Sequence, residues 1–267
     1  MFKFFSKREV ADDYRDSKQA LVTLYNPKSA ASEAYRMLRT NIHFSSGGDA
    51  FKVLVITSTF PGEGKSLTAA NLAITFAQAG EGVVLVDADM RRSSQHEKFE
   101  MSESPGLSEA IVSGNVEASL RDGPVDGLKL ITAGITPPNP SELLHSRRMD
   151  NLLTDLKSRS DLIVLDAPPV LAVANASVLA SKADGAIVVV DMTMSDKNAS
   201  RRAIDSLRAV NARVLGTVIT GIEPVRKRYG YHNYYNGYYS GYYEGYYDDS
   251  EHSSDEHGKA HGGRTVQ

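Results

Sequence analysis

The 267-residue sequence contains no cysteine, which excludes a fold held together by disulfide bonds. It also lacks any apolar stretch of the about 18 residues that would indicate a membrane-spanning helix. Its first ten residues, MFKFFSKREV, carry charges where a secretory signal would have its apolar core. From these absences we expect a cytoplasmic protein.

The sequence also has little net charge, with a formal value of −3 at pH 7. Residues 229–267 hold two basic and six acidic side chains, a balance of −4, which leaves +1 for residues 1–228. A nearly neutral body argues against nucleic-acid binding through a broad basic face, because that mode needs many contacts to phosphates. Hydrophobic residues make up 41% of the chain and charged residues 24%, which is typical of globular proteins.

Short, continuously apolar segments alternate with helical patterns along most of the chain. The segments that we predict as strands are 52–58, 83–87, 128–132, 161–166, 185–191 and 212–220. The predicted helices are 29–45, 67–80, 148–160, 174–183 and 199–211. Continuous apolar strands separated by helices predict an α/β fold with a mostly parallel sheet flanked by helices on both faces. Ligands of such folds bind at the carboxyl ends of the strands.

Three regions follow from these patterns: a flexible N-terminal segment (1–28), the α/β domain (29–228) and a disordered C-terminal tail (229–267). The tail holds ten of the 13 tyrosines of the chain, in repeats such as YYNG, YYSG and YYEG. Glycine at every fourth position keeps this segment extended and unpacked. Polar-aromatic segments of this kind can also associate by stacking, so the tail alone does not define a function.

The stretch STFPGEGKS (58–66) lies between a predicted strand and a predicted helix, the setting of a phosphate-binding loop. Its glycines allow backbone N–H groups to turn toward an anion, Lys65 can reach the β- and γ-phosphates, and Ser66 offers a hydroxyl to Mg²⁺. The strict GxxxxGK[ST] pattern fails at its first position, which is Thr59. The residues that we expect to bind ATP are Pro61, Gly62, Glu63, Gly64, Lys65, Ser66 and Leu67.

Three acids follow predicted strands and are expected beside this loop. Asp87 and Asp89 lie in VVLVDADMRR, and Asp166 lies in DLIVLDAPP. An aspartate at a strand end can simply cap the next helix, but three acids near one loop make capping alone a poor explanation. The neighbouring Arg91 and Arg92 could stabilise phosphate charge or be merely solvated.

Taken together, PGEGKS, VLVDADMRR, LIVLDAPP and the tyrosine-rich tail resemble the bacterial tyrosine kinases of capsule and exopolysaccharide operons, in particular the stand-alone cytoplasmic type of Gram-positive bacteria. The resemblance spans about residues 29–247 and implies a P-loop NTPase fold of the deviant Walker A kind, as in MinD and ParA. By the resemblance, Lys65, Asp87, Asp89 and Asp166 are the catalytic residues. Ser66, Asp87 and Asp166 are the expected ligands of Mg²⁺, and Asp87 is the best candidate to orient or accept the phenolic proton, although the acids could exchange roles.

The resemblance implies ATP-dependent autophosphorylation of the tail in trans, which regulates polysaccharide synthesis or export. The expected acceptors are Tyr229, Tyr231, Tyr234, Tyr235, Tyr238, Tyr239, Tyr242, Tyr243, Tyr246 and Tyr247. Nineteen extended residues span up to roughly 60 Å, enough to reach a neighbouring subunit. Two alternatives stay open: a MinD- or ParA-like partition ATPase, which would carry an extra lysine at the position of Thr59, and an ATP-binding scaffold without catalysis.

The resemblance also implies partners. The residues Glu33, Arg36 and Arg39 form an ExxRxxR pattern that joins subunits into a ring in this family, although an intrahelical salt bridge would explain the same spacing. A membrane adaptor of the polysaccharide co-polymerase kind would activate the kinase and recruit it to the inner face of the cell membrane. Protein tyrosine substrates and a cognate phosphotyrosine phosphatase are expected, and nucleic acid is not.

Overall fold

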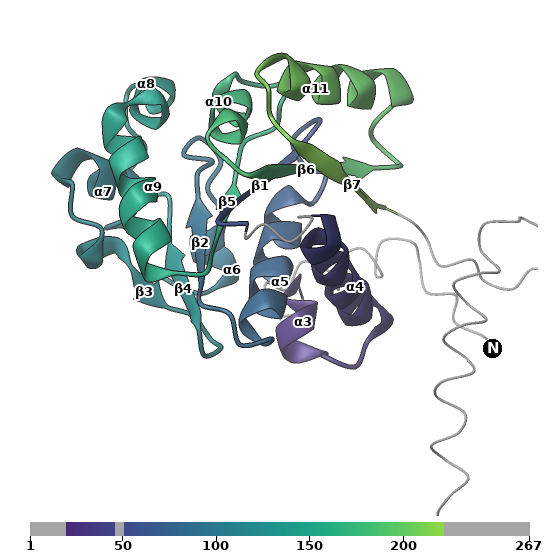
Figure 1. Cartoon of the computed structure of the whole chain (residues 1–267), viewed down its shortest axis with the longest axis horizontal. Helices are drawn as coiled ribbons and strands as arrows, with labels where there is room; N and C mark the ends of the chain where they lie inside the picture. The colour runs from purple at the N-terminus through teal and green to yellow at the C-terminus, as the bar shows by residue number, and fades with distance from the viewer. Residues whose placement is uncertain (1–19, 46–50, 222–267) are drawn as a thin grey trace, which may run out of the picture. The chain divides into compact units, whose positions relative to one another are not determined.

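The predicted apolar segments form strands of one seven-stranded sheet with the order β3-β4-β2-β5-β1-β6-β7. The structure, a computed structural model, describes residues 20–45 and 51–221 (Figure 1). The strands are β1 (Val53–Ser58), β2 (Val83–Asp87), β3 (Arg121–Asp122), β4 (Leu128–Ile131), β5 (Leu162–Asp166), β6 (Gly185–Asp191) and β7 (Val214–Thr220). All neighbouring pairs are parallel except β3 with β4, so the prediction of a mostly parallel sheet is confirmed.

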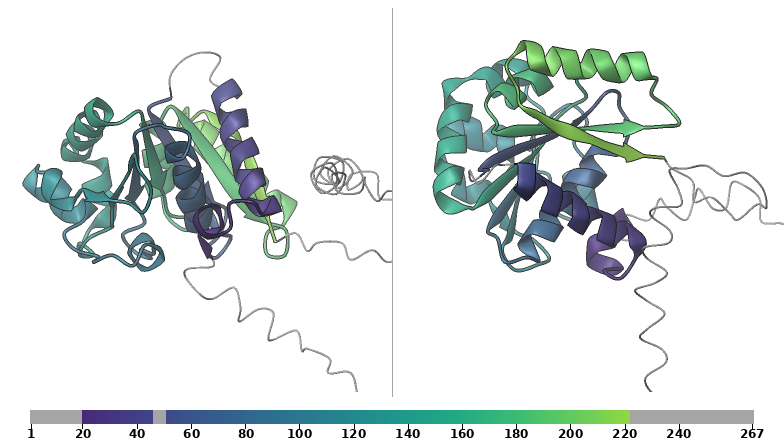
Figure 2. Two further views of the ribbon diagram at one scale, coloured as in Figure 1. Left: turned by 90° about the horizontal axis from the view of Figure 1, so that it is seen from below. Right: turned by 45° about the vertical axis from the view of Figure 1, so that its right-hand side comes forward.

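Helices cover both faces of the sheet (Figures 1 and 2). One face carries α3 (Val22–Tyr25), α4 (Ala30–Ser45) and α5 (Lys65–Ala77), and the other carries α7 (Leu107–Ser113), α8 (Pro140–His145), α9 (Arg147–Arg159), α10 (Asn175–Ser181) and α11 (Lys197–Ala209). The remaining helices, α6 (Gln95–Lys98) and the 3₁₀ turn η2 (Glu117–Ser119), lie in connections between elements.

Each central strand contributes to two separate hydrophobic cores. In β1, Val53 and Val55 pack into the core beneath α7 to α11, whereas Leu54 and Ile56 pack into the core beneath α3 to α5. This follows from the pleat, because successive side chains of a strand point to opposite faces. A strand buried on both faces favours apolar side chains at successive positions, which explains the uninterrupted apolar run VLVI at residues 53–56.

Helix α4 begins where the sequence indicates. The backbone N–H of Ser32 donates to Ser29 Oγ at 3.1 Å, so Ser29 supplies a hydrogen bond at the N-terminus of the helix. The helix then lies against α5, where Arg39 donates from its guanidinium to the carbonyl oxygen of Thr75 at 2.8 Å. Helix α4 is therefore anchored directly to the helix that follows the phosphate loop.

The described part of the N-terminal segment differs from the flexible chain predicted for residues 1–28. Leu21 and Thr23 are buried, and the side-chain amide of Asn71 on α5 forms hydrogen bonds to this segment through both its oxygen and its nitrogen. Asn71 Oδ1 accepts from the N–H and the hydroxyl of Thr23 at 3.0 and 2.9 Å, and its Nδ2 donates to the carbonyl oxygen of Ala20 at 3.0 Å. The packed domain thus begins before residue 28.

Candidate active site

The phosphate loop connects β1 to α5 and adopts a backbone that only glycine tolerates well. Gly62 and Gly64 have φ angles of 89° and 88°, in the left-handed region. A side chain at either position would strain the backbone, which explains why the motif places glycine there. Gly64 directly precedes α5, so the first N–H groups of this 13-residue helix are available to an anion at the end of the loop.

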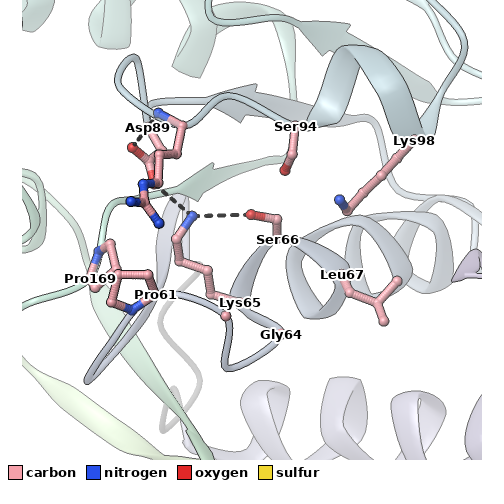
Figure 3. A pocket seen from close by; sticks show the side chains of 11 residues that line it. Pro61, Gly64, Lys65, Ser66, Leu67, Asp89, Ser94, Lys98 and Pro169 are labelled. Atoms are coloured by element: carbon pink, nitrogen blue, oxygen red, sulfur yellow. Dashed lines mark hydrogen bonds and ion pairs between the residues drawn. The ribbon is translucent and has the colours of Figure 1, made fainter. Parts of the chain in front are cut away.

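A cavity of about 260 Å³ opens at this end of α5 (Figure 3). Its lining consists of Pro61, Gly62, Gly64, Lys65, Ser66, Leu67, Asp89, Arg92, Ser94, Lys98 and Pro169. Six of the seven residues predicted to bind ATP are in this set. The volume is just below the roughly 300–1,000 Å³ of typical small-molecule sites, so the cavity matches the phosphate part of a nucleotide rather than the whole molecule.

Glu63 is the predicted loop residue that does not line the cavity. Its buried carboxylate accepts from the N–H of Phe60 at 2.7 Å and of Asp191 at 3.2 Å, and from the hydroxyl of Ser195. Its carbonyl oxygen accepts from Thr220 Oγ1 at 2.9 Å. Glu63 therefore fixes the shape of the loop against the ends of β6 and β7, and contributes to a ligand site through its position in the backbone.

Lys65 lies at the centre of the charged groups of the site. Its Nζ is 2.9 Å from Asp89 Oδ2 and donates to Ser66 Oγ at 3.1 Å (Figure 3). The same Nζ is 3.2 Å from Asp166 Oδ1. Burial alone would lower the pKa of Lys65, but the attraction of Asp166 and Asp89 raises it above its usual value. Lys65 is therefore a cation, and it contacts two of the acids that the sequence analysis places beside the loop.

The register of the sheet places Asp87 beside Asp166. Asp87 and Asp166 are paired residues at the carboxyl ends of β2 and β5, and both are fully buried. Asp87 Oδ1 accepts from the N–H of Asp89 at 3.2 Å, and Asp87 Oδ2 accepts from the N–H groups of Ser94 and Gln95 at 2.9 and 3.0 Å. Asp87 thus lies beneath the cavity, whereas Asp89 lines it.

Gln95 is a functional candidate that the sequence analysis missed. Its Nε2 donates to Asp166 Oδ2 at 2.7 Å and to the carbonyl oxygen of Ser66 at 2.9 Å, so it joins the acid of β5 to the first turn of α5. The only sequence signal was its position eight residues after Asp87, in a polar stretch without a motif. Arg92 lines the cavity, and the exposed Arg91 is not part of its lining.

Burial raises the pKa of Asp87 to about 7, and the charge of Asp166 adds to this rise. Backbone N–H donors and the charge of Lys65 act in the opposite direction but do not compensate. Because the pKa is raised above the ordinary value of 3.8, the folded chain binds a proton that the unfolded chain releases in this range. The stability that this proton provides is complete below about pH 4 and is lost as the pH rises toward 7.

Replacing Asp87 with asparagine should therefore remove a pH-dependent cost. We expect the free energy of unfolding of the Asp87→Asn chain, relative to the wild type, to increase by about 2 kcal/mol between pH 5 and 7. Urea unfolding at several pH values measures this difference. Asp205→Asn, at an exposed position of α11, is the matched control. A flat difference for Asp87→Asn would contradict the assigned pKa.

Comparison with known proteins now identifies the family. Residues 51–213 match the family model described as an AAA domain. The chain is 38% identical over 214 residues to the tyrosine-protein kinase YwqD of Bacillus subtilis, covering 79% of this chain and 90% of that protein. It is 36% identical to the putative tyrosine-protein kinase CapB of Staphylococcus aureus, covering 82% of this chain and 97% of CapB. This chain belongs to the bacterial tyrosine-protein kinases.

Solved structures agree with this family assignment. The chimerical protein CapA2B2 superposes with a TM-score of 0.74 at 34% identity, covering 77% of this chain and 91% of that chain. The kinase domain of the Escherichia coli tyrosine kinase ETK gives a TM-score of 0.74 at 31% identity, covering 80% and 84%. The cell-division ATPase MinD of Pyrococcus furiosus matches with a TM-score of 0.54 at 20% identity, which shows that the two proteins share a fold.

The kinase's predicted subunit-interface residues make contacts within the chain. Arg36 forms an ion pair with Glu33 at 2.7 Å and donates to the carbonyl oxygen of Pro27 at 2.5 Å, and Arg39 contacts α5 as described above. The intrahelical salt bridge considered for this spacing is therefore present. Both members of the ion pair remain about one-third exposed, so a role between subunits stays a prediction.

The tyrosines predicted to accept phosphate, Tyr229 to Tyr247, lie outside the described residues.

In the described ranges, no group of three or more histidines or acids is arranged to hold a metal ion by itself. Mg²⁺ at a nucleotide site commonly takes only one or two carboxylates together with phosphate oxygens and water, and Asp89 or Asp166 with Ser66 fits that donor set. None of the helices in these ranges has the length and apolar content of a membrane span.

Proposed function

We propose that this kinase binds MgATP in the cavity at the start of α5 and transfers the γ-phosphoryl group to tyrosines of its own C-terminal tail. The observation that carries the proposal is the convergence of two carboxylates on Lys65, whose Nζ lies 2.9 Å from Asp89 and 3.2 Å from Asp166, next to a glycine-rich loop and a helix start. Phosphoryl transfer depends mainly on positioning and on neutralising charge, and these are the groups that it uses.

Each side chain has a role in this proposal. Lys65 leaves its carboxylates to bind the β- and γ-phosphates, and the loop N–H groups hold the remaining phosphate oxygens. Bound Mg²⁺ would neutralise the charge that develops on the phosphates. Ser66 and Asp166 would hold this ion, with Asp87 or Asp89 as the further carboxylate. Gln95 keeps Asp166 oriented through its 2.7 Å hydrogen bond.

Asp87 is the proposed acceptor of the phenolic proton. Its pKa of about 7 suits a general base at neutral pH. Both of its oxygens accept backbone N–H groups and the residue is fully buried, so this role requires the segment of residues 88–94 to move when substrate binds. Asp89, which already lines the cavity, is the alternative. The variants Asp87→Asn and Asp89→Asn distinguish the two candidates for the general base. The variant that lacks the base should have a lower kcat for phosphoryl transfer to the phenol at every concentration of Mg²⁺.

The finer parts of the proposal come from the family resemblance. Phosphorylation would occur in trans within a ring of subunits joined through Glu33, Arg36 and Arg39. A membrane adaptor would activate the kinase at the inner face of the membrane, a phosphatase would reverse the modification, and the cycle would regulate capsule or exopolysaccharide synthesis.

Incubation of the purified chain with labelled ATP tests the proposal. We expect label on tyrosine that requires Mg²⁺ and that increases when the cytosolic peptide of an adaptor from the same operon is added. Release of phosphate from ATP without any phosphotyrosine, under both conditions, would instead indicate an ATPase. No nucleotide binding at all would contradict the proposed site.

A further inference from the structure

Two polar side chains on the cavity wall belong to none of the predicted motifs. Ser94 directly precedes α6, and Lys98 is the last residue of that short helix. Both line the cavity together with Lys65 and Ser66. Figure 3 shows the hydroxyl of Ser94 and the amine of Lys98 directed toward the cavity from the side away from Pro61 and Pro169.

The hydroxyl of Ser94 has no hydrogen-bond partner within the described ranges, although its oxygen is buried. At the position before a helix, a serine side chain usually accepts from an N–H of the first turn, and here that bond is absent. A buried hydroxyl without a partner costs stability. Its orientation into a cavity beside the phosphate loop indicates that a bound group supplies the missing partner.

Lys98 differs from Lys65 in its pairing. Lys65 contacts two carboxylates within 3.2 Å, whereas Lys98 has no ion pair or hydrogen bond to any residue of the described part of the chain. Burial lowers the pKa of Lys98, and the more distant charges of Asp166 and Asp87 partly oppose this. A half-buried ammonium group that faces a cavity without a counter-ion is placed to bind an anion.

The balance of charges around the cavity also favours a role for Lys98 in binding an anion. Lys65 is balanced by the acids around it, so it offers little net positive charge to a ligand that carries several negative charges. Lys98 and Arg92 are the other cationic side chains in the lining. Arg92 is exposed, whereas Lys98 is half-buried and faces the start of α5.

We propose that Lys98 is a second phosphate-binding lysine, which contacts a non-bridging phosphate oxygen of a bound nucleoside di- or triphosphate while the Ser94 hydroxyl donates to the same phosphate chain. This proposal rests on the proposed function, since it assigns further residues to the same nucleotide site. It predicts that the phosphates are held from two sides, by the loop and α5 on one and by α6 on the other.

Titration of the full-length chain with a fluorescent ADP analogue tests this contact. We expect Lys98→Met to raise the Kd by about tenfold or more, because a charge-assisted hydrogen bond to phosphate is lost. Lys98→Arg should retain most of the affinity, and Ser94→Ala should raise the Kd by about threefold. Lys197→Met, at an exposed position that begins α11, is the control and should leave the Kd unchanged.

The dependence of the Kd on salt separates a phosphate contact from a purely structural role. A lost ionic contact makes the dependence shallower for Lys98→Met, whereas a general disturbance of the fold does not. An unchanged Kd and salt dependence for both Lys98→Met and Ser94→Ala, in a chain whose wild type binds the analogue, would overturn this proposal alone. A wild-type chain that binds no analogue would overturn both this proposal and the proposed function. If Lys98→Met does not fold, Lys98→Arg and Ser94→Ala decide the outcome by the same titration.

Discussion

The Lys65→Met chain should lose tail phosphorylation by about 10³-fold or more. In the proposed site Lys65 binds the β- and γ-phosphates, and the other cationic side chains of the cavity lining, Arg92 and Lys98, do not come from α5. Quantitative phosphotyrosine detection on the purified chain, after incubation with MgATP, measures the loss. Lys65→Arg keeps a cation at this position and should retain a small fraction of the activity.

The same substitution should destabilise the ligand-free chain. Lys65 neutralises Asp89 and Asp166, and its removal leaves buried carboxylates without a cation, which typically costs about 3–5 kcal/mol. The charge of Lys65 also lowers the pKa of Asp87, so its removal should raise that pKa further, and the loss of stability should grow as the pH rises from 5 to 8. Adding Asp89→Asn should recover part of the stability while the activity stays absent.

A Lys65→Met chain that keeps full tail phosphorylation would contradict the activity prediction and support the alternative of an ATP-binding scaffold without catalysis.

Replacing the ten tail tyrosines with phenylalanine should reduce autophosphorylation to background while leaving nucleotide binding unchanged. Three tyrosines lie outside the tail: Tyr35 is half-buried on α4, Tyr25 is the last residue of α3, and Tyr14 lies outside the described residues. Intact mass spectrometry after incubation with MgATP measures the number of phosphates per chain. Phosphate retained at wild-type levels on the variant would place the acceptors elsewhere.

This variant also tests a consequence for assembly. Each phosphotyrosine adds about −1.5 to −2 charges, so phosphorylation of half the tail tyrosines adds roughly −8 to −10 to an already acidic segment. Repulsion from the acids of a neighbouring site should then loosen a ring held by bound tails. We expect the wild type to shift to smaller species on incubation with MgATP and the ten-fold Tyr→Phe variant to keep its mass. Assembly that is indifferent to phosphorylation in the wild type would refute the loosening.

The sheet was predictable because its strands are buried on both faces. The strand Val83–Asp87 is apolar up to the acid at its end, and its predicted bounds agree with the structure. The two-residue strand β3 (Arg121–Asp122) was not predicted, because two polar residues at a sheet edge show no apolar or alternating pattern. Helix α6 is four polar residues long and gave no helical period, so Gln95 and Lys98 could not be placed beside the phosphate loop.

The candidate site was predictable to the extent that it follows from strand ends. Asp87 and Asp166 lie together because their strands are neighbours in a parallel register, which the sequence can suggest but does not specify. The different positions of Asp87 and Asp89 depend on backbone N–H groups of residues 89, 94 and 95, and no local pattern reveals these contacts. The inward direction of the Glu63 carboxylate likewise depends on Ser195 and Asp191, more than 120 residues away.

The most direct test of the account mixes two inactive chains. The Lys65→Met chain keeps its tail but lacks the proposed phosphate-binding lysine, and the ten-fold Tyr→Phe chain keeps the site but lacks acceptors. Each alone should remain unphosphorylated in MgATP, and the mixture should acquire phosphate on tail tyrosines of the Lys65→Met chain, located by peptide mass spectrometry. A mixture that remains unphosphorylated while the wild type modifies itself would contradict transfer in trans from the Lys65 site.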